Sequence, residues 1–272
     1  ILPSVVNVKD EISEFISHKN IAFNDEVLFG HALAKVFNTP KNQPHKNISK
    51  RADIEGVKKI IHTSDNGYLN PKNANSILTL AGIDFVDEFE VGSEDQLIQV
   101  SQKITYPVVQ KVVGPLHKSD SGGVILNVKN KQELLSNFRK LMQIKDATSV
   151  LIQPMISGKE LFIGAKREIP FAPIIMCGLG GIFVEVLKDV SIGMVPVSKT
   201  DAAEMIKSLK AYPILEGIRG QKGIDLKKFE ALICKISHLM ETVPEIAELD
   251  INPLLASADD IKAVDVRIRI EK

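Results

Sequence analysis

The sequence has no excess of either charge and no long apolar run. Lysine plus arginine and aspartate plus glutamate each number 34 among the 272 residues. A chain without net charge has no broad attraction for nucleic acids or for anionic membranes. Its apolar runs are shorter than the roughly 20 residues that span a bilayer as a helix. The composition therefore predicts a protein that binds neither nucleic acid nor membrane.

Cysteine is also scarce. Cys177 and Cys234 lie far apart in apolar surroundings, which predicts two buried thiols instead of a disulfide or a metal site. Such thiols are typical of a reducing compartment, so the expected location is the cytoplasm. No signal peptide is visible, and the chain starts at Ile1 without methionine, so we expect a piece of a longer polypeptide. Its length predicts one large domain or two lobes.

No Walker A motif is present, but a lysine inside a short apolar run is a candidate for phosphate binding. Residues 108–113 are rich in β-branched side chains, which predicts a buried strand, and Lys111 lies within it. A buried ammonium without a partner is costly, so Lys111 must reach one. An ordinary hairpin with an exposed lysine would explain the spacing equally well.

A glycine pair follows this strand after a polar loop. The loop contains His117, and Gly122 and Gly123 precede a second expected strand over 124–128. Glycines let backbone N–H groups approach anionic oxygens, and a nearby lysine supplies the opposite charge. A neutral imidazole accepts a phosphoryl group near pH 7, which makes His117 the candidate catalytic residue.

Local signals predict helices that alternate with short strands over most of the chain. Residues 38–51 have the polar composition of a linker. The expected helices cover 27–37, 54–62, 71–81, 93–104, 131–141, 200–210 and 226–243, and an earlier helical pattern has Ile12, Phe15 and Ile16 on one face. The expected N-caps are Asn70, Asn130, Asp225 and Ser93, of which Ser93 forms a capping box with Gln96. The helix over 226–243 has an apolar stripe, which predicts that this face is buried. The expected strands cover 85–91, 108–113, 124–128, 149–154, 160–165, 174–176, 182–187, 248–253 and 263–270, and the strand over 149–154 is expected to pair the two lobes.

Two stretches near the end of the sequence alternate apolar and polar residues. Strand alternation puts Asp250 and Asn252 on one face and Asp265 on the polar face of the next stretch. If the two strands are adjacent, their oxygens converge, as magnesium requires when it binds carboxylates together with substrate phosphates. A solvated face with Asp265 paired to Arg267 or Arg269 is the alternative, and the spacing by itself favours that alternative.

Taken together, five stretches resemble the nucleotide-binding part of the ADP-forming acyl-CoA synthetases, relatives of the β subunit of succinyl-CoA synthetase. They are residues 106–111, 117–124, 178–190, 210–213 and 248–254, in the order of that family. Residues 1–37 resemble the tail of the CoA-ligase domain that precedes this region in fused members. An ordered series of motifs is far more specific than any one of them.

The resemblance implies an α+β ATP-grasp fold, in which two lobes clasp the nucleotide. It divides the chain into a CoA-ligase-like tail at 1–37, a linker at 38–51 and an ATP-grasp domain at 52–272. Within that domain the lid lobe is expected at about 84–150 and the remainder forms the second lobe.

The same resemblance implies roles for individual residues. Gln153 and the backbone near Met155 are expected to read adenine, and Glu160 to hold the ribose hydroxyls. The residues implied to bind ATP or ADP are Lys111, Gly122, Gly123, Gln153, Met155 and Glu160. Those implied to bind Mg²⁺ are Asn252 and Asp265, with Asp250 close by. His117 matches a histidine that passes a phosphoryl group to the nucleotide.

The implied reaction joins acyl-CoA, ADP and phosphate to give a carboxylic acid, CoA and ATP through a phosphohistidine. Its partners are upstream CoA-binding and CoA-ligase domains of the same polypeptide, and the resemblance also leaves room for a homo-oligomer. Two other functions stay open: a self-contained ATP-grasp carboxylate ligase, and a non-catalytic nucleotide-binding regulatory module of a fused acetyltransferase.

Overall fold

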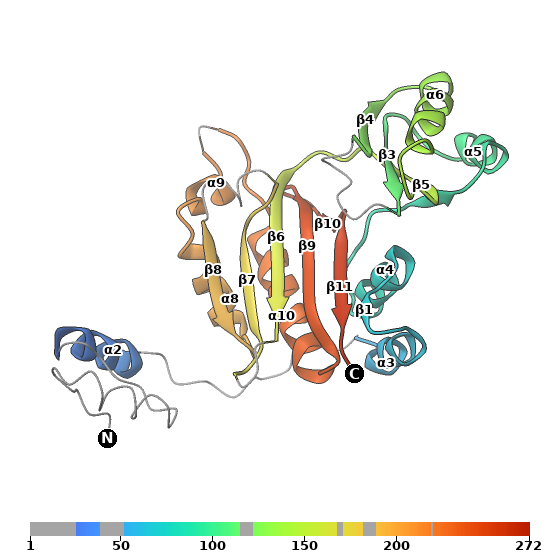
Figure 1. Ribbon diagram of the computed structural model, residues 1–272. Coiled ribbons are helices and arrows are strands. Elements are labelled where there is room, and N and C mark those ends of the chain that lie inside the picture. The colour runs from blue at the N-terminus through green and yellow to red at the C-terminus, as the bar shows by residue number, and fades with distance from the viewer. Residues whose placement is uncertain (1–25, 39–51, 115–121, 168–170, 182–188, 219) are drawn as a thin grey trace. The chain divides into compact units, whose positions relative to one another are not determined.

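The computed structural model divides the chain into two units, residues 1–46 and 47–272. It describes residues 26–38, 52–114, 122–167, 171–181, 189–218 and 220–272. In the first unit the described part is helix α2 (Glu26–Asn38), where a helix was predicted (Figure 1). Most of the predicted tail and linker, the strand expected over 182–187 and His117 lie outside the described residues.

A seven-stranded antiparallel sheet forms the larger part of the second unit. Its strand order is β1-β11-β9-β6-β7-β8, and β10 pairs with β9 (Figure 1). The strands are β1 (Gly67–Tyr68), β6 (Lys159–Lys166), β7 (Ile174–Leu179), β8 (Val190–Met194), β9 (Ile246–Ala256), β10 (Ile261–Ala263) and β11 (Val266–Ile270). Because β9 lies between β6 and β11, its side chains are central to the sheet.

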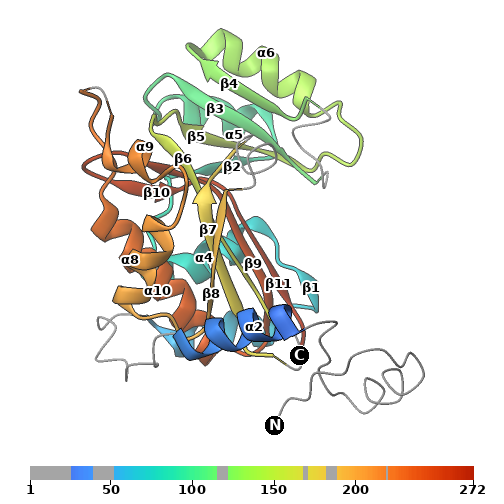
Figure 2. The ribbon, with the colours of Figure 1, turned by 90° about the vertical axis from the view of Figure 1, so that its left-hand side faces the viewer.

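Helices α8 and α10 pack against strands β6, β7 and β8 of this sheet. Figure 2 shows α8 and α10 together on one side of the strands. The helices are α3 (Ile54–Thr63), α4 (Pro71–Leu80), α8 (Lys199–Lys207), α9 (Tyr212–Glu216) and α10 (Leu226–Thr242). The apolar stripe predicted for α10, which includes Phe229, Ile233 and Met240, is buried in the core. Among the described residues, no helix has the length and apolarity needed to cross a membrane.

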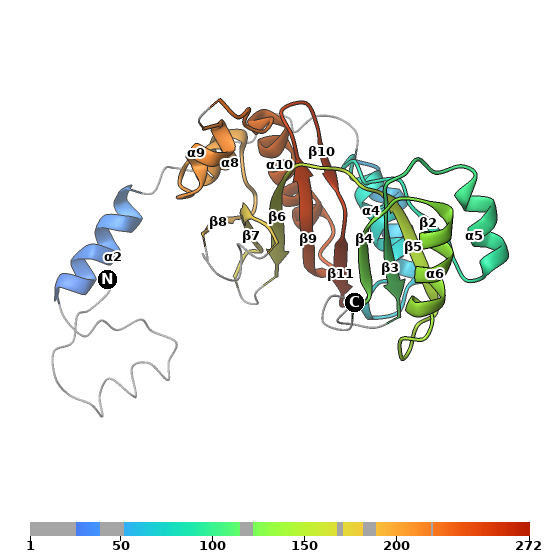
Figure 3. The same ribbon diagram turned by 90° about the horizontal axis from the view of Figure 1, so that it is seen from above.

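A four-stranded antiparallel sheet forms the smaller lobe, with the strand order β2-β5-β3-β4. Figure 3 shows helices α5 (Glu94–Ser101) and α6 (Lys131–Leu141) on one side of it. The strands are β2 (Phe89–Val91), β3 (Val108–Val113), β4 (Val124–Val128) and β5 (Ser149–Pro154). Among the described strands, β5 pairs with β2 and β3, so it belongs to the small lobe. The expectation that it pairs the two lobes is therefore wrong.

The two faces of β3 and β5 have different environments. Val112 and Ile152 pack into the core of the small lobe beneath α5 and α6. The alternate residues, which include Lys111 and Gln153, point to the opposite face. The small sheet therefore presents one face to its own core and one face to the candidate site.

Several helix starts follow directly from local sequence. Asn70, Ser93, Asn130 and Asp225 each accept a hydrogen bond from the backbone N–H three residues later, as predicted. The capping box expected at Ser93 is only half formed, because the Gln96 side chain accepts from Gly92 N–H. Both cysteines are buried and free, and burial raises the pKa of the Cys177 thiol to about 12.

Two predicted strands are shorter than expected, and in both the missing part lies next to β10. The stretch 263–270 is split into β10 and β11, with Val264 and Asp265 between them. The stretch 85–91 forms a strand only from Phe89, because its first part bonds to β10: Val86 N–H donates to Ala263 O at 2.9 Å. The break in each strand places polar groups between the two sheets.

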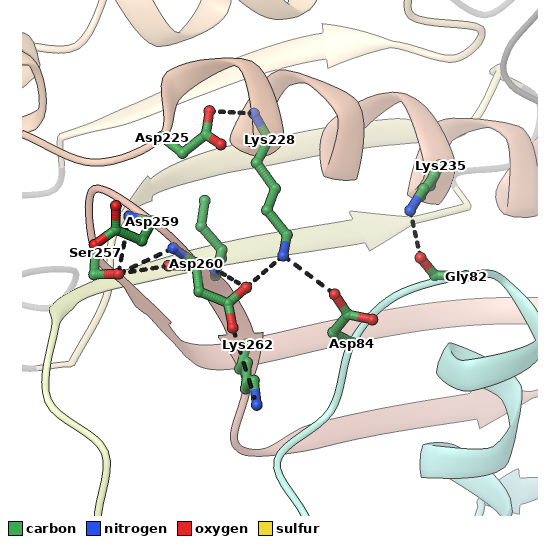
Figure 4. Close-up of polar contacts among 10 residues, drawn as sticks. Gly82, Asp84, Asp225, Lys228, Lys235, Ser257, Asp259, Asp260 and Lys262 are labelled. Carbon is green, nitrogen blue, oxygen red and sulfur yellow. Dashed lines mark hydrogen bonds and ion pairs between the residues drawn. The ribbon is translucent and has the colours of Figure 1, made fainter.

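The segment that leads from α4 to β2 is fixed at its base by lysines of α10. Lys228 forms ion pairs with Asp84, at 3.2 Å, and with Asp260 of the β9–β10 turn (Figure 4). Lys235 donates a hydrogen bond to the Gly82 carbonyl oxygen. The chain that enters the small lobe therefore starts from a point bound to the large one.

Candidate nucleotide site

Lys111 projects from the small sheet toward the large one. Its side chain is buried, with 8% of its surface exposed, and Nζ donates to the Val264 carbonyl oxygen at 3.1 Å. The prediction that a lysine inside this strand is buried and reaches a partner is confirmed. This acceptor is a neutral carbonyl, and the ammonium also interacts electrostatically with the Glu88 carboxylate.

Gln153 lies on the same face of the small sheet and reaches the same oxygen. Its amide Nε2 donates to Val264 O at 3.2 Å and to Glu88 Oε2 at 2.9 Å. Only 2% of the residue is exposed, and its Oε1 has no hydrogen-bond partner among the described residues. The side chain expected to read adenine therefore carries a buried acceptor that awaits a donor.

Glu88, which sequence reasoning missed, lies between the lobes. Its carboxylate accepts hydrogen bonds from Gln153 of β5 and from Asn75 of α4. Burial raises the pKa of Glu88 and the Asp265 charge adds to that rise, while both hydrogen bonds and Lys111 oppose it. No local pattern signals this residue, because its partners lie 13 and 65 positions away in the chain.

The large sheet brings Asn252 and Asp265 opposite each other. Ile251 pairs with Val266, and Asn252 N–H donates to Asp265 O at 3.2 Å. The predicted adjacency of the two stretches is therefore confirmed. Asp265 also lines a small cavity whose other polar lining residues are Asn75, Glu88, Lys111 and Gln153.

Asp250 lies on the same face but opposite Arg267. Burial raises the pKa of Asp250, Arg267 opposes that rise, and the charges of Asp265 and Glu248 add to it. Asp250 lines a second cavity of about 160 Å³, together with Tyr68, Gly164, Lys166 and Arg267. Asp250 is thus on the face of the other two predicted metal ligands, but it lies opposite a cationic side chain, Arg267.

The donor set of this face fits magnesium bound together with a nucleotide. Asn252 and Asp265 offer an amide and a carboxylate oxygen, and Mg²⁺ commonly binds one or two carboxylates plus substrate phosphates. Among the described residues, no group of three or more histidine, cysteine, aspartate or glutamate side chains could hold a metal ion. The protein therefore fits a magnesium site that nucleotide oxygens complete.

The glycine turn after β7 joins Glu160 to Asn252. Gly181 has φ +60°, and its N–H donates to Asn252 Oδ1 at 3.1 Å. A Cβ at Gly181 would collide with Glu160 Oε2, and Gly180 N–H donates to Glu160 O at 2.7 Å. Only a residue without a side chain permits this approach. One turn thus positions the residue implied for ribose and one implied for metal.

Met155, Gly122 and Gly123 are not among the residues that line this cavity. Met155 is 41% exposed, and its N–H donates to Pro107 O at 3.0 Å. Gly122 is exposed with φ +68°, and Gly123 accepts from Val112 N–H at 2.8 Å. The structure thus brings Lys111, Gln153 and Asp265 around one cavity, and Glu160 and Asn252 at the adjoining turn.

Two antiparallel lobes, with a lysine on the smaller sheet facing acidic and amide side chains on the larger, define the ATP-grasp class. A model of the ATP-grasp domain matches residues 59–270. The chain belongs to the ADP-forming acyl-CoA synthetase family, of which it represents the ATP-grasp, or β-subunit, part. The resemblance seen in the sequence motifs and the expected α+β ATP-grasp fold are both confirmed.

Individual relatives support this assignment. The chain is 44% identical over 216 residues to the β subunit of acetate–CoA ligase (ADP-forming) I from Pyrococcus furiosus, covering 75% of this chain and 93% of that one. It is 34% identical over 252 residues to 4-hydroxybutyrate–CoA ligase (ADP-forming) from Nitrosopumilus maritimus, covering 87% of this chain but only 36% of that ligase. It therefore spans about one third of that longer relative.

Solved structures of related enzymes share the fold. The dinucleotide-forming acetyl-coenzyme A synthetase 1 of Ca. Korarchaeum cryptofilum, in complex with coenzyme A and Ca-AMPCP, superposes with a TM-score of 0.73 at 34% identity. That match covers 79% of this chain and 98% of the other. A protein from Pyrococcus horikoshii gives a TM-score of 0.72 at 31% identity, with 81% and 98% of the two chains covered.

Proposed function

We propose that this chain transfers a phosphoryl group between ADP or ATP and a phosphohistidine of a CoA-ligase part. Together the two parts convert acyl-CoA, ADP and phosphate into a carboxylic acid, CoA and ATP. The observation that carries the proposal is the position of Lys111, whose ammonium reaches the backbone of Val264 next to Asp265. The Lys111 ammonium and the Asp265 carboxylate thus border one small cavity between the two sheets.

Phosphoryl transfer depends mainly on positioning and on the neutralisation of charge. Lys111 would exchange its carbonyl partner for a phosphate oxygen and neutralise part of its charge. Asn252 and Asp265 would hold Mg²⁺, which screens the charge of the phosphates when it is bound. Glu160 would accept hydrogen bonds from the ribose hydroxyls, and the glycine turn keeps its carboxylate beside Asn252.

The phosphoryl donor must come from another part of the enzyme. In the Ca. Korarchaeum cryptofilum synthetase with coenzyme A and Mg-AMPPCP, a phosphohistidine segment points towards the nucleotide-binding site. We infer that the present site receives such a segment and that His117 takes part in the transfer of its phosphoryl group. The CoA-ligase part supplies the CoA site and the acyl site.

The proposal is tested by assaying ADP-dependent release of CoA with this chain alone, with the CoA-ligase part alone and with both. We expect the chain alone to bind Mg-ADP in calorimetry and to convert no acyl-CoA, and the mixture to show activity. Robust turnover by the 272-residue chain alone would replace the proposal with a self-contained carboxylate ligase. Nucleotide binding without turnover in the mixture would indicate a regulatory module.

A second test concerns His117. In the assembled enzyme, His117→Ala should abolish ATP formation and leave the affinity for Mg-ADP near that of the unmodified protein. Full turnover in this variant would reduce His117 to a loop residue and leave the role of the ATP-grasp domain unchanged.

A further inference from the structure

Glu88 connects the two lobes at the wall of the nucleotide site. It lies just before β2, in the segment whose base is bound to α10, and its two partners come from different lobes. Asn75 belongs to α4 beside the large sheet, whereas Gln153 belongs to the small sheet. The carboxylate is half-buried, so these hydrogen bonds are protected from water.

The contacts of Gln153 define which end of its amide faces the ligand. Nε2 donates to two acceptors, the Glu88 carboxylate and the Val264 carbonyl. A rotated amide would set Oε1 against those two acceptors and lose both hydrogen bonds. Gln153 therefore keeps Oε1 as its unsatisfied group, and a buried unsatisfied acceptor costs about 1–3 kcal/mol until a donor reaches it.

The chemistry of a nucleotide indicates which of its groups can donate a hydrogen bond to Gln153 Oε1. Ionised phosphates have no hydrogen to donate, and we place the ribose hydroxyls at Glu160. Among the groups of a purine, the 6-amino group of adenine is a donor, whereas a 6-oxo purine presents an acceptor at the same position. Gln153 with its amide held in this orientation therefore complements adenine and opposes a 6-oxo base.

We propose that Glu88 is a positioning residue that holds Gln153 as a hydrogen-bond acceptor and thereby makes the site select adenine over 6-oxo purines. The inference rests on the proposed function, because it assumes that the base lies against Gln153. Glu88 also faces Lys111, so its loss affects phosphate binding as well. That second effect is the same for every nucleoside diphosphate, whereas the effect through Gln153 depends on the base.

The test compares the dissociation constants of Mg-ADP and Mg-IDP, measured by calorimetry. Inosine diphosphate differs from ADP at the 6-position and its neighbouring ring nitrogen. We expect Glu88→Leu to reduce the preference for ADP about tenfold, since one hydrogen bond to a charged group is lost while Val264 still holds the amide. Glu88→Gln should reduce the preference for ADP less, because the glutamine keeps one acceptor oxygen. That oxygen can accept from one of the two donors, the amide of Gln153 or that of Asn75.

Two further variants separate positioning from a general effect. Asp87→Asn removes the same charge from the exposed neighbouring residue and should leave the ratio unchanged. In a Gln153→Met background, Glu88→Gln should have no further effect on the ratio, because the amide that it positions is absent.

The outcomes are distinguishable. An unchanged ratio of the two dissociation constants in both Glu88 variants overturns the inference and leaves the proposed function intact. If that unchanged ratio comes with equally weaker binding of ADP and IDP, Glu88 acts only through its charge, and the positioning role is likewise overturned. If the unmodified chain binds neither nucleotide, the proposed function fails. Thermal unfolding of each variant identifies any loss of fold, and Glu88→Gln retains the size of the native side chain if Glu88→Leu does not fold.

Discussion

The Lys111 ammonium and the Val264 carbonyl oxygen lie 3.1 Å apart, although the two residues are 153 positions apart in the chain. This hydrogen bond joins the small sheet to the break between β10 and β11, next to Asp265. Gln153 donates to the same oxygen. In the proposed site, the ammonium that donates to Val264 would turn one of its three N–H donors to a nucleotide phosphate.

Removal of the Lys111 charge should weaken nucleotide binding. Lys111→Met keeps the aliphatic part of the side chain and loses a charge-assisted hydrogen bond, which corresponds to an affinity loss of about 10- to 100-fold for Mg-ADP. Calorimetry measures this directly. The control is Lys129→Met, an exposed lysine just beyond β4 of the same lobe. Equal affinities in the two variants would contradict the site.

Magnesium dependence should distinguish Asp265 from Asp250. Asp265→Asn is expected to raise the Mg²⁺ concentration needed for half-maximal ADP binding about tenfold, because a charged ligand becomes a neutral one. Asp250→Asn should have a smaller effect, since Asp250 lies opposite Arg267. A Mg²⁺ titration at fixed ADP measures both, with the exposed Asp259→Asn as control. A larger effect at Asp250 would move the metal toward the second cavity.

Asp250 should also make stability depend on pH. Burial raises its pKa above the ordinary value of 3.8, so the native state binds this proton more tightly than the unfolded state. Stability therefore falls as pH rises through the window between the two values, and it remains lower above that window. Asp250→Asn cannot ionise, so its melting temperature should exceed that of the unmodified protein at pH 7.

The advantage of Asp250→Asn should shrink as the pH is lowered toward 3.8, where the native carboxyl is already protonated. Thermal unfolding monitored by circular dichroism at several pH values provides the measurement. An advantage that grows on acidification would show that Arg267 outweighs burial at this position.

The glycine turn offers a matched pair of substitutions. Gly181→Ala should lower the free energy of unfolding by about 1–2 kcal/mol through its left-handed backbone, and also weaken ADP binding by displacing Glu160. Gly220 has a similar φ, +78°, but no atom lies within 4 Å of an added Cβ. Gly220→Ala should therefore lower the free energy of unfolding in the same way and leave ADP binding unchanged. Urea unfolding and calorimetry compare the two. Normal ADP affinity in Gly181→Ala would remove Glu160 from the site.

Local chemistry explains which parts of the fold were predictable. Helix starts such as Asn70 and Asp225 depend on a bond to a residue three positions away, and α10 has an apolar stripe along one face. The lysine in β3 was identifiable because a charge inside an apolar strand needs a partner. Features that depend on residues within a single helix or strand could therefore be predicted from the sequence.

Features that depend on distant partners were not predictable. The alternation over 263–270 is continuous, yet the strand breaks at Val264, whose carbonyl accepts from Lys111 and Gln153 of the other sheet. Glu88 resembles any exposed acidic residue in sequence. Its role depends on an amide that is 65 positions away. The motif series located the site, but only the packing of two lobes shows how Glu88 joins it.

The order of strands in the large sheet has a consequence for how the domain is made. Among the described strands, β1 pairs only with β11, and β9 connects β11 to β6. Strands β1, β6, β7 and β8 therefore share no sheet until residues 246–270 are available. The small sheet, in contrast, is built entirely from residues 89–154. Short-range sheets form before long-range ones. On a growing chain, the strands that carry Lys111 and Gln153 can therefore pair before the strand that carries Asn252 has been synthesised, whereas the hydrogen bonds of both side chains to Val264 must form later.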